Sequence, residues 1–286
     1  MASKPVSFKS RFASIIAALP LVAGLLSGAS PAAHAAEPWP GQVHAVYRIE
    51  FNGFDIGSFD FSANVNGASY TLTGDAKISA LLGAFRWQGA TRTSGSLAAD
   101  APKPAGYTFD FNASSKSGSI KMGFAGENVT SLAHVPPFVP QPGIINVREQ
   151  HLKAVLDPLS AVMALSRSDS ANPCGRRLSV FDGKQRFDLM LSFRRQERIS
   201  EQRPSGQPGV AYVCKVKYTP IAGHKVSEET RALAMSNDIE ISLRPVPSAN
   251  LFVPHSITIP TGAGTARLIA QSVRIVTRSE QIALGH

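Results

Sequence analysis

The sequence predicts an all-β, mostly antiparallel fold, with about a dozen strands in a curved sheet or half-open barrel and one short α-helix. Three observations predict it. Apolar and polar residues alternate over most of the chain, turn residues interrupt this alternation at short intervals, and only one stretch has good helix-starting chemistry. Alternation with period two is expected of strands that bury one face. Many short strands separated by turn residues are typical of sandwiches and barrels.

A leader precedes the expected domain. Basic residues come first, an apolar run follows, and the small-residue pattern Ala33-His34-Ala35 ends it. This order is that of a cleavable secretory signal peptide, and the apolar run is too short for a spanning helix. We therefore expect residues 1–35 to be removed and residues 36–286 to form a single exported β-rich domain.

The charge of the mature chain is modestly positive. The leader carries three of the 29 basic residues and none of the 20 acidic ones, which leaves 26 against 20 and a net charge of +6. Such a charge favours anionic surfaces, for example lipid headgroups. The basic residues are scattered, so together with export this argues against a nucleic-acid partner.

The strand pattern is clearest at the start of the domain. Odd positions from Val43 to Phe51 are apolar, and Asn52-Gly53 then precedes a second alternating run. Asn-Gly between alternating runs predicts a two-residue hairpin. Further strands are expected over 57–65, 69–78, 85–97, 106–113, 118–124, 128–134, 177–181, 185–199, 210–218, 238–244, 255–259 and 265–276.

Two segments differ from this pattern, and the end of the chain lacks it. Residues 135–143 hold four prolines and cannot form a central strand; a crossover or lid is favoured over a domain linker.

Residues 156–167 begin with Asp157 as an N-cap and Pro158 at the first helical position. We expect a short helix there, whose Leu159, Val162 and Met163 plug the concave side or an open end of the sheet; a surface connector is the alternative. Residues 277–286 are expected to fray.

The stretch from Asn172 to Leu189 contains one of only two cysteines and an Asp-Gly turn. Apolar alternation on both sides of Asp182-Gly183 predicts a hairpin, with Asp182 serving the turn rather than catalysis. An even cysteine count in an exported chain predicts a disulfide between Cys174 and Cys214. Two buried free thiols remain the alternative.

Four motifs in this order are similar to a known family. They are Y-x-I-x-F-N-G-F-D-I-G (47–57), D-P-L-S (157–160), C-G-R-R-L-x-V-F-D-G-K-Q-R-F-D-L (174–189) and Y-x-C-x-V-x-Y (212–218). Together they resemble an exported bacterial family known as domain of unknown function 3108. The resemblance implies a periplasmic β-rich protein without an established enzyme activity. It also implies a shape like the half-open barrels of envelope proteins, some of which bind lipids or peptides.

Motifs of catalysis or metal binding are missing from the sequence. There is no G-x-S-x-G or H-E-x-x-H, and the histidines are dispersed, so no catalytic residue, metal site or cofactor is predicted. Arg194 and Arg198 are the candidate anion contact, because alternation puts them on one face and turns Arg195 away; a solvated strand end is the alternative reading of these arginines.

We therefore expect a non-enzymatic envelope protein that binds a lipid, an acyl chain or an extended peptide on the concave face of its sheet. A structural scaffold that docks an envelope protein partner through a sheet edge, and a hydrolase with an unrecognised site, are the alternatives. The sequence does not determine the oligomeric state.

Overall fold

The computed structural model describes residues 39–80, 83–98, 101–139, 141–167, 172–201 and 204–285, which belong to one compact unit, Glu37–His286. The expected signal peptide, residues 1–35, lies outside the described residues. In the described part of the chain, fourteen strands form one antiparallel sheet. The predicted all-β, mostly antiparallel fold is confirmed.

The first half of the sheet is a meander in which each strand pairs with the next. Its strands are β1 (Gln42–Phe51), β2 (Phe54–Asn66), β3 (Ser69–Ala80), β4 (Phe85–Ala98), β5 (Ala101–Ala113), β6 (Lys116–Ala125) and β7 (Asn128–Val135). The predicted Asn52-Gly53 hairpin joins β1 to β2, and both residues have positive φ, 51° and 83°. These angles are those of a two-residue hairpin turn, which is why Asn-Gly is found there.

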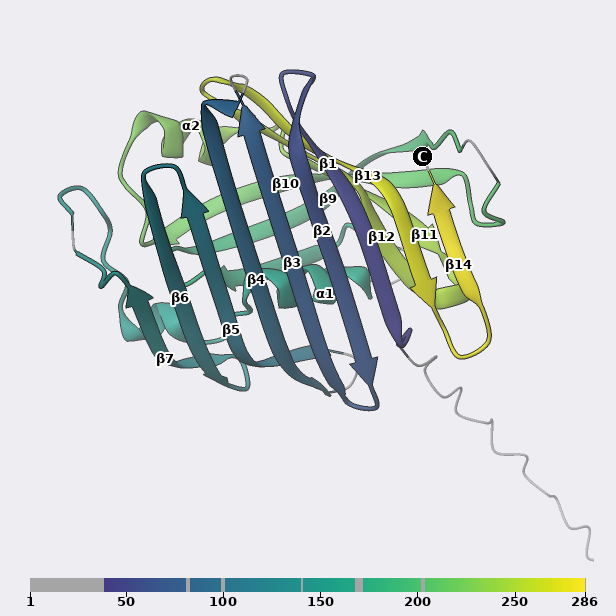
Figure 1. The fold of residues 1–286 in the computed structure, drawn as a ribbon, viewed down its shortest axis with the longest axis horizontal. Coiled ribbons are helices and arrows are strands. Elements are labelled where there is room, and N and C mark those ends of the chain that lie inside the picture. Colours follow the sequence, from purple (N-terminus) through teal and green to yellow (C-terminus); the bar gives the residue numbers. More distant parts are fainter. Residues whose placement is uncertain are drawn as a thin grey trace, which may run out of the picture. The chain divides into compact units, whose positions relative to one another are not determined.

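The second half is another meander, which returns to the first strand. It comprises β8 (Arg176–Phe181), β9 (Arg186–Arg198), β10 (Val210–Ala222), β11 (Glu240–Val246), β12 (Leu251–Thr261) and β13 (Gly264–Val276). Strand β13 pairs with β1, so the sheet order is β7-β6-β5-β4-β3-β2-β1-β13-β12-β11-β10-β9-β8. In Figure 1, β1–β7 form the near layer, and β9 and β10 lie behind them together with α1 (Pro158–Ser166).

The sheet is open, although its two ends lie close together. No backbone ladder joins β7 to β8. Instead His134 Nε2 of β7 donates to the Gly183 carbonyl in the β8–β9 turn (2.8 Å). The Val155 N–H donates to Glu127 O (2.8 Å), and the Leu156 N–H donates to Ser179 O (2.9 Å). Residues 155–156 thus connect the two ends of the sheet. The half-open barrel that the sequence predicts is held by these backbone hydrogen bonds and by the His134 side chain.

The crossover between the meanders is the proline-rich segment followed by η2 (Glu149–Leu152) and α1. Residues 136–139 form no strand, as their prolines predict, and Phe138 and Val139 are exposed. An isolated bridge between Ile144 and Lys225 ties the segment to the loop after β10.

The structure corrects two expectations. A second helix, α2 (Glu228–Met235), follows β10 and begins at Ser227, whose hydroxyl accepts from the Thr230 N–H (3.2 Å). It has eight residues and buries none of them completely, although Leu233 packs against a buried cluster. The final residues do not fray: β14 (Gln281–Gly285) pairs with β13 and buries Ile282 and Leu284. A short 3₁₀ turn, η3 (Pro247–Ala249), also precedes β12.

Candidate functional site

The helix α1 crosses the concave face of the sheet and begins where the sequence predicts. Asp157 Oδ1 accepts from the N–H groups of Leu159 and Ser160 (both 3.0 Å) and from Thr93 Oγ1 of β4 (2.7 Å). The first two bonds satisfy helix N–H groups that have no partner within the helix. The third bond fixes the start of the helix to the sheet. Asp157 is fully buried, and burial raises the pKa of its carboxyl group, against the hydrogen bonds that lower it.

Two further contacts hold α1 in place. Ser160 Oγ lies 2.8 Å from the Tyr70 hydroxyl on β3, and both side chains are buried. At the other end, an Arg176 Nη2 group donates to the carbonyls of Ala164 (3.0 Å) and Arg167. Cations near the last carbonyls of a helix donate to acceptors that have no partner within the helix, and they interact favourably with the negative end of the helix dipole. The helix is therefore anchored to β3 and β4 at its start and to β8 at its end.

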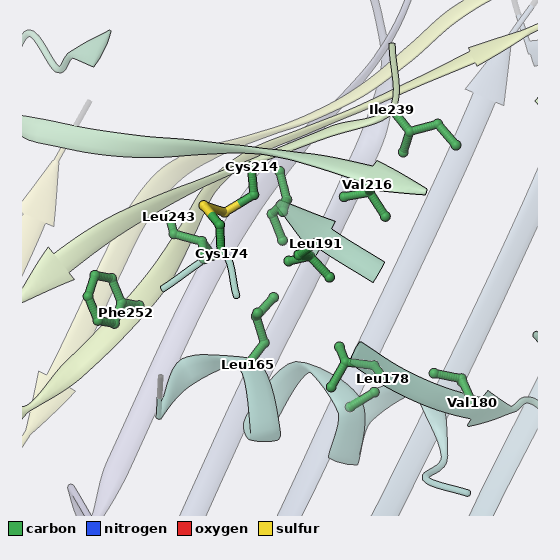
Figure 2. Packing of buried hydrophobic residues seen from close by; sticks show 12 residues of the cluster. Leu165, Cys174, Leu178, Val180, Leu191, Cys214, Val216, Ile239, Leu243 and Phe252 are labelled. Carbon is green, nitrogen blue, oxygen red and sulfur yellow. A yellow bond between two sulfur atoms is a disulfide. The ribbon is translucent and has the colours of Figure 1, made fainter. Parts of the chain in front are cut away.

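The side chains of α1 pack against both layers. Ala161 and Leu165 belong to a buried cluster with β8–β12, and Leu159 and Met163 belong to another with β2 and β3. Figure 2 shows Leu165 directed from α1 toward this first cluster. The helix thus fills one part of the space inside the curved sheet.

Beside α1 an apolar cavity remains. The space that the centre of a water molecule can reach is about 80 Å³, and the whole hollow, with its part open to solvent, measures about 820 Å³. Its walls come from β1, β2, β3, β12 and β13, from α1, and from Trp39 and Pro40 just before β1. The lining residues are Trp39, Pro40, Val43, Ala45, Tyr47, Phe59, Phe61, Ala63, Val65, Leu72, Leu159, Val162, Met163, Ser166, Leu251, Val253, Pro254, Ile257 and Leu268.

The lining offers almost no polar chemistry. The Tyr47 hydroxyl donates to Pro254 O (3.0 Å), and burial raises the pKa of this phenol, so the group is neutral and already bonded. The Ser166 hydroxyl donates to Val162 O (3.1 Å). The Arg167 guanidinium lies 4.7 Å from the centroid of the Trp39 ring at the end of the helix. The apolar wall of this hollow, which is partly open to solvent, is typical of small-ligand sites.

Comparison with known protein families identifies one that matches this chain. The family model described as "Protein of unknown function (DUF3108)" matches residues 46–271. The chain belongs to this family. Comparison with curated proteins and with solved structures found no match. The matched region contains α1 and most of the strands of both meanders, and 15 of the 19 residues that line the cavity lie within it.

The motifs that resemble this family have structural roles here. The D-P-L-S motif is the start of α1 with its bonds to Thr93 and Tyr70. In the motif of residues 174–189, Asp182 Oδ1 accepts from the N–H groups of Lys184 and Gln185 (both 2.7 Å), as expected of a turn residue. Burial raises the pKa of Asp182, although these hydrogen bonds and the charge of Lys184 oppose the shift.

The predicted disulfide between Cys174 and Cys214 is confirmed. Its S–S distance is 2.04 Å and its Cα atoms are 5.3 Å apart. Both cysteines are fully buried in the cluster that receives Leu165 (Figure 2). The bond joins the segment after α1 to the middle of β10, so the alternative of two free thiols is excluded.

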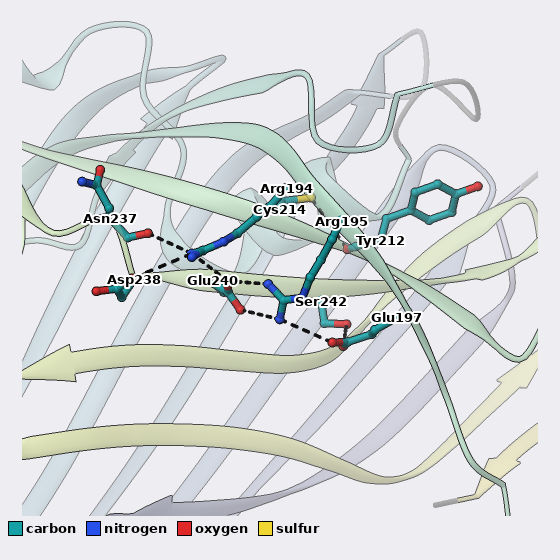
Figure 3. Close-up of polar contacts among 9 residues, drawn as sticks. All are labelled: Arg194, Arg195, Glu197, Tyr212, Cys214, Asn237, Asp238, Glu240 and Ser242. Carbon is teal, nitrogen blue, oxygen red and sulfur yellow. Dashed lines mark hydrogen bonds and ion pairs between the residues drawn. The ribbon is translucent and has the colours of Figure 1, made fainter.

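The arginines of β9 are arranged differently from the expectation. Arg194 Nη1 lies 2.8 Å from Glu240 Oε1, and the guanidinium of Arg195 binds both oxygens of the same carboxylate (2.7 and 3.0 Å) (Figure 3). The prediction that Arg195 points away is wrong. Val213 pairs with Arg195 but Cys214 pairs with Phe193, so Arg194 is the extra residue of a β-bulge.

Arg194 already forms an ion pair with Glu240, whereas Arg198 is exposed at the end of β9. The hydrogen bonds from Arg195 and the nearby positive charges hold the pKa of Glu240 below its usual range, against the effect of burial. The anion contact of Arg194 and Arg198 stays a prediction.

Sequence reasoning named the helix side of the cavity, Leu159, Val162 and Met163, and missed its sheet side. The apolar alternation of β1 and β2 marked those side chains as buried but could not show what they face. Within the described residues there is no group of histidine, cysteine and acidic side chains able to hold a metal ion. No helix in that part of the chain is long and apolar enough to span a membrane.

Proposed function

We propose that this protein is a non-enzymatic carrier or sensor of the bacterial periplasm that binds the acyl chain of a lipid in the cavity beside α1. The observation that carries the proposal is the lining of the cavity, in which Tyr47, Phe59 and Leu268 of the sheet face Val162 and Met163 of the helix. An acyl chain needs only apolar contact, and each methylene that it buries contributes about 0.8 kcal/mol.

An extended peptide is a poorer occupant of the same space. Each peptide unit carries an N–H and a C=O that need partners when they are buried. The two hydroxyl groups of the lining, on Tyr47 and Ser166, already donate to backbone carbonyls. A hydrocarbon brings no N–H or C=O that needs a partner, and the one side-chain donor of the described lining residues without a hydrogen bond, the indole N–H of Trp39, is a single group.

The periplasmic location rests on two features of the chain. The pattern of residues 1–35 is that of a leader for export, and the Cys174–Cys214 bond requires an oxidising environment for its formation. Fusion of residues 1–36 to a reporter that is active only after export tests this part. Retention of the reporter in the cytoplasm would contradict it.

The acyl-chain proposal predicts a dependence of affinity on chain length. Two added methylenes contribute about 1.6 kcal/mol, which corresponds to roughly a 15-fold tighter dissociation constant until the chain fills the cavity. Equilibrium dialysis with saturated fatty acids of increasing length measures this dependence. An affinity that does not change with chain length would overturn the proposal.

A cavity-filling variant gives the matched test. Val162→Trp places a large ring in the hollow, and we expect it to weaken binding at least tenfold because it occupies the space of the ligand. Ser96→Trp adds the same side chain at an exposed position of β4 and should bind as the wild type does. Equal binding by both variants, with melting temperatures like the wild type, would contradict the assignment of this cavity.

A further inference from the structure

A row of aromatic side chains continues from the cavity across the concave face. Cross-strand pairing places Phe59 of β2, Ala76 of β3, Gly89 of β4, Phe111 of β5 and Gly118 of β6 side by side in this order. Neighbouring strands are about 4.8 Å apart, so Phe59 and Phe111 are separated by roughly 14 Å. The residues between them, Ala76 and Gly89, have small side chains.

The rings of this row lie over glycines. A Cβ atom on Gly89 would be 2.4 Å from the Trp87 ring, and one on Gly118 would be 2.7 Å from the Phe111 ring. The Phe109 ring lies between these two, with centroids 6.4 Å from Trp87 and 5.9 Å from Phe111. We call Phe59, Trp87, Phe109 and Phe111 the aromatic shelf. The rings therefore lie flat against the backbone of the sheet at these two glycines.

The far part of the shelf does not belong to the packed core. Trp87 and Phe111 are only half-buried, and neither is a member of a buried hydrophobic cluster of the described residues. Phe59, at the near end, lines the apolar cavity. Part of the Trp87 and Phe111 rings is therefore accessible, and accessible aromatic side chains that lie together can form a surface for binding.

A positive charge stands at the far end of the shelf. The β8–β9 turn packs there, since a Cβ atom on Gly183 would be 2.4 Å from Ile120 of β6. Lys184 Nζ in this turn is 5.5 Å from the centroid of the Phe111 ring. Lys184 is exposed, and no carboxylate of the described residues lies within ion-pair distance of it. The neighbouring Asp182 accepts two backbone N–H groups through Oδ1, and the charge of Lys184 also acts on this carboxyl group.

We propose that the ligand is an anionic amphiphile, with its carboxylate or phosphate beside Lys184 and its acyl chain running over the aromatic shelf into the cavity beside α1. This inference rests on the proposed function and adds the charge of the head group and the direction of the chain. The Gln185 side chain and the Tyr218 hydroxyl, 3.4 Å apart, provide further polar groups at the same end.

The two tryptophans of the chain report the two ends of this path. Trp39 lines the cavity and Trp87 lies on the shelf, and the sequence contains no other tryptophan. In Trp87→Phe the remaining emission comes from the cavity, and in Trp39→Phe it comes from the shelf. Stearic acids that carry a spin label either near the carboxylate or near the methyl end quench the emission of a tryptophan that they contact.

The proposal predicts that the label near the carboxylate quenches Trp87 more strongly and that the label near the methyl end quenches Trp39 more strongly. The opposite pattern would mean that the ligand binds in the opposite direction. It would overturn the inference but not the proposed function. Absence of saturable quenching at both tryptophans would overturn both.

A second test concerns the charge. Lys184→Ala should weaken the binding of palmitic acid and of palmitoyl lysophosphatidic acid about fivefold, as loss of a partly exposed ion pair would. The uncharged monopalmitoylglycerol should bind wild type and variant equally. Lys121→Ala removes the same charge from the other face of β6, where Lys121 is exposed, and is the control.

The relative losses for the two anions show which head group Lys184 contacts more closely. Equal binding of the charged and neutral probes by wild type and Lys184→Ala would overturn the inference. If the neutral probe still binds in that case, the proposed function, which requires only an acyl chain, is not contradicted.

Discussion

Reduction of the Cys174–Cys214 bond should lower the melting temperature of the protein by about 8 °C. The two cysteines are 40 residues apart in the sequence. The chain-entropy relation gives roughly 4 kcal/mol for a closed loop of that length. An unfolding entropy of about 2.1 cal/mol/K per residue gives roughly 0.5 kcal/mol/K for a domain of this size, and the quotient is the expected shift.

Two perturbations separate the crosslink from the packing of the sulfur atoms. Reductant breaks the crosslink and leaves both sulfurs in place. The double variant Cys174→Ala/Cys214→Ala also removes two fully buried atoms from a cluster that contains Leu191 and Leu243. We expect the double variant to melt below the reduced wild type, because cavities in a packed core cost additional stability.

The assay is thermal unfolding followed by circular dichroism, with thiol titration to establish the redox state. Reduced protein with two titratable thiols and a melting temperature within about 2 °C of the oxidised form would refute the reasoning. That result would mean that the unfolded chain gains little freedom when the bond opens.

Two further predictions concern buried carboxylates. Asp157→Ala should lower the free energy of unfolding by about 2–4 kcal/mol, because it removes the N-cap of α1 and leaves the buried Thr93 hydroxyl without its acceptor. Asp157→Asn keeps an acceptor oxygen and should lower it less. Equal losses of stability for the two variants in denaturant titrations would contradict this role of Asp157. Despite burial, hydrogen bonds from Arg177 and Arg186 hold the pKa of Asp188 below its usual range. Folding therefore favours the Asp188 carboxylate, and its stabilisation is present above the unfolded-state pKa of about 3.9 and is lost as the pH falls through the lower folded value. Asp188→Asn should lower the melting temperature at pH 7 and reduce its fall on acidification, and an acid profile identical to that of the wild type would count against the assignment.

Local patterns predicted most of the strands because their causes are local. Alternation in β1 marked Ala45, Tyr47 and Ile49 as the inner face, and all three are buried. Asn52-Gly53 fixed the turn that follows. Asp157 and Pro158 defined the start of α1, since capping depends on only a few neighbouring residues.

Features that depend on distant pairing could not be predicted in this way. The cavity exists because β1 pairs with β13, more than 200 residues further along the chain, and this brings Leu268 opposite Ile49. The bulge at Arg194 depends on the register between β9 and β10. The aromatic shelf likewise needs the register of β2–β6, since Gly89 and Gly118 carry no signal of the rings above them.

The most direct test of the central claim is native mass spectrometry of the exported protein purified from its own host, followed by solvent extraction of what is bound. The account predicts a reproducible adduct of lipid mass on the wild type that contains an acyl chain and an anionic group, and a marked loss of this adduct in Val162→Trp but not in Ser96→Trp. A wild-type protein that carries no adduct, and that still binds none after incubation with the extracted lipids of the host, would contradict it.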